Sequence, residues 1–130
     1  MVTNKNKFSK SERLCSKKAI EFLFQEGKSF YCSPFLIVWA YSNSDMPFPA
    51  QVAFSIPKKE FKLAVTRNLI KRRTREAYRL NKATLYDILH SKEKKIVFTM
   101  IYRDKSIPDY LTVENSVKEM IKMFSPILES

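Results

Sequence analysis

The segment RNLIKRRTREAYR, residues 67–79, contains the side chains whose types and spacing could support a chemical function. Six of them are cations, and Lys82 follows just outside the segment. Neighbouring like charges repel and cost stability, so either these side chains point into water or a strongly anionic group lies against them. Arginine binds phosphate oxygens through paired hydrogen bonds, which makes phosphate recognition the chemistry to consider first. The six cations are Arg67, Lys71, Arg72, Arg73, Arg75 and Arg79.

A helix would sort these side chains by charge. At about 100° per residue, five of the cations and Asn68 fall within about 140° of one another. The apolar residues Leu69, Ile70, Ala77 and Leu80 fall on the other side, and Arg73 has to extend past their edge to reach water. A solvated helix face normally mixes both signs, whereas Glu76 is the one acid among residues 67–82. The pattern favours a phosphate-binding face, on which Asn68 can hydrogen-bond a sugar or base edge.

The charge of the whole chain indicates the same partner class. The 130 residues carry 24 Lys and Arg against 13 Asp and Glu, a formal net charge of +11. Residues 1–18 contribute +5 and residues 58–82 contribute +8, whereas 19–57 sum to −2 and 83–130 to zero. Such an excess favours RNA, DNA or an anionic membrane surface as partner. Hydrophobic residues make up 45%, so the chain has enough apolar material for one folded domain.

No side-chain pattern for protein-borne catalysis or metal binding stands out. Cys15 and Cys32 lie seventeen residues apart with no C-x-x-C, which favours free thiols and leaves a zinc site without ligands. His90 is the single histidine, and the acids are scattered with no D-x-D or D-x-E. A nuclease that used its own side chains would need a base or a cluster of carboxylates. No apolar run approaches a membrane span and the N-terminus is polar, so we expect a cytoplasmic protein.

Periodicity predicts the elements that position the basic segment. We expect a helix at 16–27 with Ser16 as N-cap, and one long strand at 29–42 in which Pro34 marks a bulge or an edge. A second strand follows at 50–56, and residues 57–65 form a loop with a short strand that runs into the next helix. That helix spans about 66–80, or reaches Leu89 with a break. A strand at 94–103 and a final helix capped by Thr112 complete the order α-β-β-(β)-α-β-α, an α+β sandwich.

The stretch FSIPKKEFKLAVTRNLIKRRTREAYR resembles the signature of the bacterial ribonuclease P protein subunit. That family has a Lys-Lys pair after a strand, then an Arg-Asn-x-x-Lys-Arg-x-x-Arg run that opens its central helix. The resemblance extends from about Arg13-Leu14 through FLFQEGKSF to Phe124. Two departures are Leu69, where a cation is usual, and Pro57, where a small polar residue is usual. The matching positions are Lys58, Lys59, Arg67, Asn68, Lys71, Arg72 and Arg75.

The resemblance implies a fold and a division of labour. The fold is a two-layer α+β sandwich with a left-handed β-α-β crossover, similar to a domain of a small-subunit ribosomal protein and of a translocation factor. Family members bind a large catalytic RNA and assist removal of the 5′ leader from precursor tRNA. The chemistry belongs to the RNA and its Mg²⁺ ions, with none on the protein, which alone is expected to be a monomer. Besides the matching positions, we expect Arg79 and Arg13 to bind RNA.

A second implied surface is a cleft between the first helix and the sheet, which receives the single-stranded leader. Bases of single strands stack on aromatic rings above a cationic groove. Phe24 and Phe35 match the family's aromatic positions. Both could instead belong to the core, and Trp39 and Tyr41 on the same strand share that ambiguity because the register is open.

Domain boundaries and rival functions complete the expectations. We expect a flexible basic arm at 1–8, a single RNA-binding domain at 9–125 and a tail at 126–130. A non-catalytic ribosomal or chaperone-like RNA-binding protein would use the same basic face. A DNA-binding module is weaker, because no turn-helix partner accompanies the basic helix.

Overall fold

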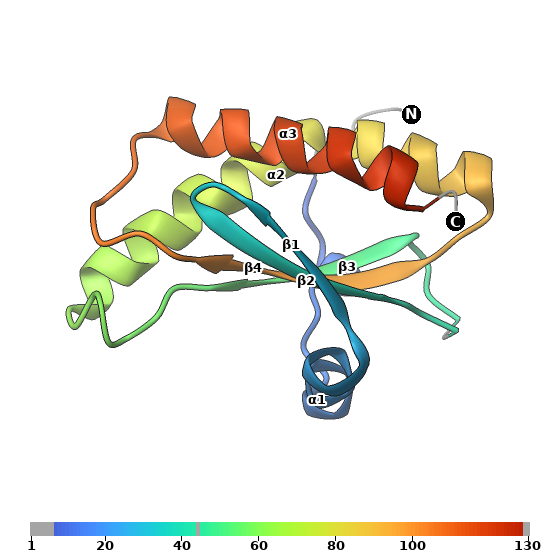
Figure 1. Ribbon diagram of the computed structural model, residues 1–130, viewed down its shortest axis with the longest axis horizontal. Helices are drawn as coiled ribbons and strands as arrows, with labels where there is room; N and C mark the ends of the chain where they lie inside the picture. The colour runs from blue at the N-terminus through green and yellow to red at the C-terminus, as the bar shows by residue number, and fades with distance from the viewer. Residues whose placement is uncertain (1–6, 44, 129–130) are drawn as a thin grey trace.

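The computed structural model describes residues 7–43 and 45–128 (Figure 1). The chain begins with a short 3₁₀ turn, Lys10–Glu12. The helices are α1 (Lys17–Glu26), α2 (Ala64–Lys92) and α3 (Tyr110–Ile127), and the strands are β1 (Lys28–Cys32), β2 (Phe35–Tyr41), β3 (Ala50–Ser55) and β4 (Ile96–Tyr102). The predicted α+β class is confirmed, and the order is α-β-β-β-α-β-α.

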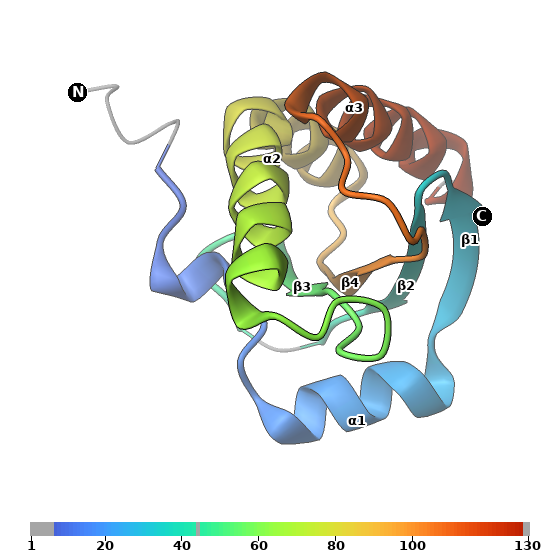
Figure 2. The same cartoon turned by 90° about the vertical axis from the view of Figure 1, so that its left-hand side faces the viewer.

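The strands form one sheet in the order β1-β2-β4-β3. β2 is antiparallel to both β1 and β4, whereas β3 and β4 are parallel and are joined through α2. In Figure 2, β3 and β4 run towards the viewer beneath α2, and β4 lies to the right of β3. That arrangement makes the β3-α2-β4 crossover left-handed, the exception to the usual hand of such connections.

The sheet lies between two unequal helical layers. α2 and α3 cover one face, and α1 crosses the other face, where Figure 1 shows it end-on. The larger apolar core fills the space between the sheet and the α2–α3 pair, and the sheet and this pair of helices form the two layers that were predicted. A smaller cluster lies under α1, where the fully buried Leu23 packs with Val38, Ala40 and Val97. α1 thus forms a third, smaller layer on the face of the sheet opposite α2 and α3.

The third strand before α2 does not come from the segment predicted to supply it. Residues 29–42 are not one strand: Cys32 pairs with Phe35, so Ser33 and Pro34 form a tight hairpin turn between β1 and β2. Proline has no N–H to donate to a ladder and favours turns, which is why the apolar run divides there. The short strand expected within 57–65 is absent: residues 57–63 form a turn and a loop, and α2 begins at Ala64.

The predicted helices are all present, with corrections to the length of α2 and to the N-cap of α3. α1 is capped as predicted, because the Ser16 hydroxyl accepts a hydrogen bond of 3.2 Å from the Ala19 amide. α2 runs for 29 residues without the expected break. α3 is capped by Asp109, whose carboxylate accepts a 2.8 Å bond from the amide of Thr112, so Thr112 lies inside the helix and does not cap it.

The predicted tail partly belongs to the fold. α3 continues to Ile127, and Leu128 is buried. Over the described residues, none of the helices has the length and apolarity to cross a bilayer.

Candidate nucleic-acid interface

The helical wheel prediction of a charged side on α2 holds in three dimensions. We call this side the basic face. Asn68, Arg72 and Arg75 are exposed, whereas Arg67, Lys71 and Arg79 are half-buried. The face begins at the first turns of α2, directly after residues 57–63, a loop that carries the exposed Lys58 and Lys59 and that we call the lysine loop. The basic face consists of Arg67, Asn68, Lys71, Arg72, Arg75 and Arg79.

The buried side of α2 is rotated relative to the predicted one. Ile70 and Ala77 are fully buried as predicted, but Leu80 is exposed and Leu69 is half-buried. Tyr78 instead turns into the core. α2 packs against β3 on one side and α3 on the other, so its neighbours decide which side is buried.

Arg67 connects the basic face to the lysine loop. Its Nη1 donates hydrogen bonds to the carbonyl oxygens of Phe61, at 2.7 Å, and of Lys62, at 3.0 Å. The ring of Phe61 is buried, with its centroid 5.9 Å from that of Tyr102. The end of the loop next to α2 is therefore held at Phe61 and Lys62. The Phe61 amide also donates a 3.2 Å hydrogen bond to the carbonyl of Pro57, which closes the turn that carries Lys58 and Lys59.

Two further arginines of α2 have protein partners. Arg73 extends from the edge of the apolar side, as predicted, and donates a 2.6 Å hydrogen bond to the carbonyl of Pro108 before α3. Arg79 forms an ion pair of 2.7 Å with Glu76, whose pKa is lowered mainly by this hydrogen bond. The charge of Arg79 is thus partly balanced within α2 by the neighbouring acid Glu76.

Lys82 is buried and does not belong to the cationic surface. It is 97% buried and forms an ion pair with the equally buried Glu12 from the N-terminal segment. Residues 1–6 of the predicted flexible arm lie outside the described residues. Its last residue, Phe8, packs against Phe54 and Tyr78, with ring centroids 5.9 and 5.7 Å apart, so this end of the arm belongs to the folded domain.

α1 presents an aromatic ring on either side of its contact with the sheet. Phe22 and Phe24 flank the buried Leu23, so their side chains project about 100° to either side of it. Phe22 lines a pocket with Gln51 and Val97, which lie near the starts of β3 and β4. Phe24 therefore projects towards the other end of these strands, where the lysine loop follows β3. Its side chain is 57% exposed, which excludes a core role.

Phe35 does not lie where the leader cleft was predicted. It is fully buried on the opposite face of the sheet from α1, and its ring packs against Tyr102 at 5.4 Å. Trp39 lies on that same face and packs against Phe124 of α3. Alternation along β2 gives the reason, because Leu36, Val38 and Ala40 are the residues that face α1.

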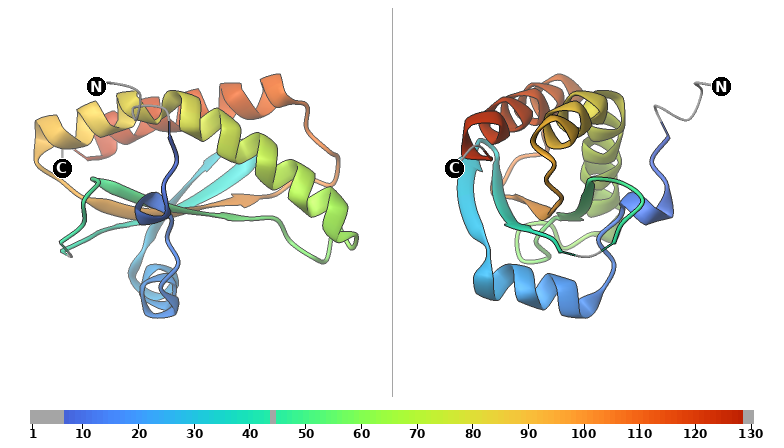
Figure 3. Two further views of the ribbon diagram at one scale, coloured as in Figure 1. Left: turned by 180° about the vertical axis from the view of Figure 1, so that it is seen from behind. Right: turned by 90° about the vertical axis from the view of Figure 1, so that its right-hand side faces the viewer.

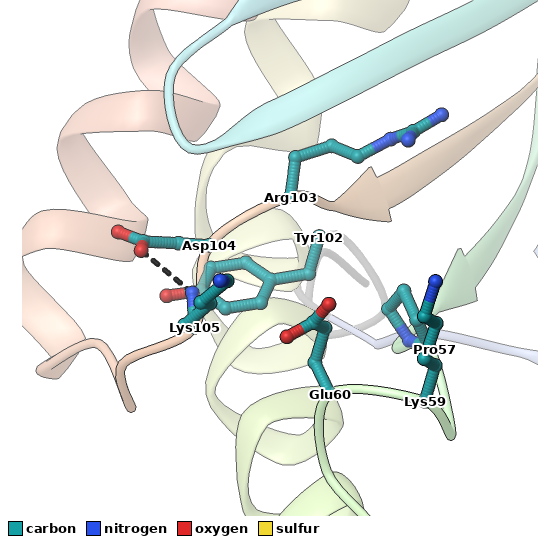
Figure 4. A pocket seen from close by; sticks show the side chains of 7 residues that line it. All are labelled: Pro57, Lys59, Glu60, Tyr102, Arg103, Asp104 and Lys105. Carbon is teal, nitrogen blue, oxygen red and sulfur yellow. Dashed lines mark hydrogen bonds between the residues drawn. The ribbon is translucent and has the colours of Figure 1, made fainter.

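Arg103 is a further exposed cation that the sequence analysis did not single out. It follows the buried Tyr102 at the end of β4, and its exposed side chain lines a cavity of about 290 Å³ (Figure 4). Lys59 and Lys105 bring two more cations to this cavity, and Glu60 and Asp104 bring acids. The signal was available in the sequence: a charged residue that ends an apolar strand, next to a tyrosine that alternation turns into the core.

The described residues show no arrangement of side chains suited to hold a metal. Within 7–43 and 45–128, no three His, Cys, Asp or Glu residues come together as a metal site would require. His90 is exposed near the end of α2. What the geometry supports chemically is the binding of a polyanion by cations and exposed aromatic rings.

Known proteins match this chain in sequence. The family model described as Ribonuclease P matches residues 8–125. The ribonuclease P protein component of Porphyromonas gingivalis is 35% identical over 113 residues, which cover 87% of this chain and 82% of the relative. That of Petrotoga mobilis is 30% identical over 118 residues, covering 88% of this chain and 92% of the relative.

Solved structures agree with the sequence matches. The RNase P protein of Staphylococcus aureus superposes with a TM-score of 0.70 at 20% identity, covering 87% of this chain and 94% of that one. The RNase P protein from Thermotoga maritima gives 0.68 at 25% identity, with 86% and 96% covered. The chain belongs to the ribonuclease P protein family, and RNA binding and a part in tRNA processing follow from that membership.

Proposed function

We propose that this chain binds the catalytic RNA of ribonuclease P through the basic face and the lysine loop, and the 5′ leader of precursor tRNA beside Phe24. In this way it assists the endonucleolytic 5′ maturation of tRNA. The RNA, with Mg²⁺ that the RNA itself holds, performs the cleavage. The protein enters the complex as a monomer and works in the cytoplasm.

The observation that carries this proposal is the uncompensated charge at the start of α2. Arg72 and Arg75 are exposed, and Glu76 is already paired with Arg79. Repulsion between such cations costs stability, which an RNA backbone laid against them would reverse. The bonds from Arg67 to Phe61 and Lys62 anchor the loop that carries Lys58 and Lys59 next to the start of α2, which supports a contact of the same RNA with both segments.

The aromatic ring of α1 supports the leader part of the proposal. Phe24 is exposed and projects towards the end of the sheet that also carries the lysine loop and Arg103. A base can stack on an exposed ring while cations nearby neutralise its phosphate. Single-stranded leader bound there would leave the basic face of α2 free for the catalytic RNA.

The decisive experiment is reconstitution of precursor tRNA cleavage. Protein alone, treated with nuclease and repurified, should not cleave, and cleavage should appear when the partner RNA and Mg²⁺ are added. Cleavage by RNA-free protein would overturn the assignment of chemistry to the RNA.

A second experiment identifies the RNA that copurifies with the protein, which distinguishes this function from that of a ribosomal or chaperone-like protein. A single structured RNA that supports cleavage is expected, and ribosomal RNA would contradict the proposal.

A further inference from the structure

The N-terminal segment, residues 7–14, is built onto α2 and β3. In Figure 3 it runs from beside α2 across the edge of the sheet to α1. The Leu14 amide donates a 2.9 Å hydrogen bond to the carbonyl of Val52, and the Gln51 side chain donates one of 3.1 Å to the carbonyl of Ser11. Both bonds join the segment to β3, and the ring of Phe8 packs against Tyr78 of α2.

Glu12 is the polar centre of this contact. One carboxylate oxygen accepts bonds from the Ser9 amide, at 2.8 Å, and the Ser9 hydroxyl, at 3.1 Å, which closes the 3₁₀ turn. The other oxygen accepts bonds from the ammonium of Lys82 and the hydroxyl of Tyr86, both on α2. Glu12 is 1% exposed and Lys82 is 3% exposed, so each charge depends on the other for its compensation.

Lys82 occupies the position where the basic face would continue. It follows Arg75 by seven residues, almost two helical turns, and so lies on the same side of α2 about 10.5 Å further along. Burial against Glu12 removes its charge from the surface. The guanidinium of Arg13 lies 5.7 Å from the centroid of the Phe8 ring, and the ammonium of Lys82 lies 5.7 Å from the same centroid. Arg13 is exposed, so its guanidinium presents a positive charge at the surface beside the buried Lys82.

We propose that Glu12 is a positioning residue for RNA binding: its buried pair with Lys82 holds the N-terminal segment on α2 and sets Arg13 as the cation that ends the basic face. The inference rests on the proposed function, because Arg13 is assigned an RNA phosphate. Removing one partner of a buried pair leaves the other charge uncompensated, whereas removing both is often tolerated. Glu12→Gln should therefore release the segment, and Glu12→Gln combined with Lys82→Met should restore it.

The test measures affinity for the partner RNA of ribonuclease P as a function of salt, from about 50 to 200 mM, with full-length protein. Arg13→Gln keeps most of the side-chain length and should flatten the log–log slope by about 0.7 to 0.9, the value of one phosphate contact. Glu12→Gln should cause the same loss by itself. In that background Arg13→Gln should change nothing further, and in the Glu12→Gln/Lys82→Met background its full effect should return.

Hydrogen exchange on the free protein tests the positioning step without RNA. The Leu14 amide should exchange faster in Glu12→Gln and return to its original rate when Lys82→Met is added, while amides of β4 stay protected. Met120→Ala in the core of α3 is the control: it should lower the melting temperature and leave the salt slope unchanged. Should Glu12→Gln fail to fold, Phe8→Ala releases the same segment and should abolish the effect of Arg13→Gln.

Each contrary result is decisive. An equal loss from Arg13→Gln in every background would show that Glu12 does not position it, and no loss in any background would show that Arg13 does not contact the RNA. Unchanged exchange at Leu14 in Glu12→Gln would overturn the holding role. If the unmodified protein fails to bind the RNA, the proposed function is wrong, while the exchange data still decide whether Glu12 holds the segment.

Discussion

The guanidinium of Arg67 donates a 2.7 Å hydrogen bond to the carbonyl oxygen of Phe61, in the loop that precedes α2. Arg67, the first cation of the basic face, therefore stabilises the fold in addition to any contact that it makes with a ligand. By bonding to the carbonyls of Phe61 and Lys62, it anchors to α2 the loop that also carries Lys58 and Lys59. Arg67 and its neighbours on α2 should consequently respond differently to mutation.

Arg67→Ala should lower both stability and RNA affinity, whereas Arg72→Ala should lower affinity alone. The first loses hydrogen bonds from a charged donor to two carbonyls, each worth about 1–3 kcal/mol when buried and less at this half-buried position. Arg72 is exposed, and its loss should flatten the salt dependence of RNA binding by about 0.7 to 0.9. Melting temperatures measured beside RNA titrations check both. Unfolding by Arg72→Ala with an unaffected Arg67→Ala would contradict the assignment.

Phe24→Ala should weaken binding of precursor tRNA to the assembled complex by about 5- to 150-fold, the equivalent of about 1–3 kcal/mol for one stacked base. Mature tRNA, which lacks the leader, should bind as before. Because Phe24 is 57% exposed, the melting temperature should change little. Phe22→Ala is a matched control, since Phe22 is 48% exposed on the opposite side of α1. Equal losses from the two variants would exclude a specific role for Phe24.

Phe35→Ala should behave as a core truncation. The side chain is fully buried against Tyr102, so its loss should cost about 3–5 kcal/mol of unfolding free energy. Denaturant unfolding measures this directly. Binding of precursor and mature tRNA should decline together, in proportion to the unfolded fraction. A selective loss of precursor binding with unchanged stability would return Phe35 to the leader site.

Stability should depend on pH through Glu12. Burial raises the pKa of this carboxyl, but hydrogen bonds from Lys82, Tyr86 and the Ser9 amide outweigh burial, and the pKa is lowered from its usual 4.5. A pKa lower in the folded state means stability that is fully present above the unfolded-state pKa. It is lost as the pH falls from about 4.5 through the folded-state value. Unfolding free energies measured over this acid range should fall less steeply for Glu12→Gln than for the unmodified protein, and parallel curves would contradict the prediction.

Asp109→Ala should destabilise the protein by about 0.5–2 kcal/mol, because its carboxylate caps α3. Thr112→Ala is the matched comparison: Thr112 is exposed inside the first turn, and alanine keeps the backbone amide that the Asp109 carboxylate caps while removing the hydroxyl beside that carboxylate. Thermal unfolding of the two variants distinguishes them. A larger loss for Thr112→Ala would restore the cap that sequence reasoning assigned.

The sequence by itself determined the local features of this protein. Periodicity and capping residues were enough for α1, because Ser16 and the apolar spacing of Ile20 and Leu23 act within one helix. The same holds for the charged side of α2, since about 100° per residue separates Arg72 and Arg75 from Ile70 whatever surrounds the helix. The family resemblance added the left-handed crossover, which no local pattern encodes.

Tertiary structure decided what depends on neighbours. Alternation makes two faces on β2 but does not say which one meets α1. The expectation that Phe35 lines the leader cleft therefore depended on an open register, and the packing of Phe35 against Tyr102 places it in the core instead. Lys82 reads as one more surface cation in the sequence, and only the approach of Glu12, seventy residues earlier, buries it. Facing and burial come from contacts between segments distant in sequence, and a periodic pattern within one segment carries no information about them.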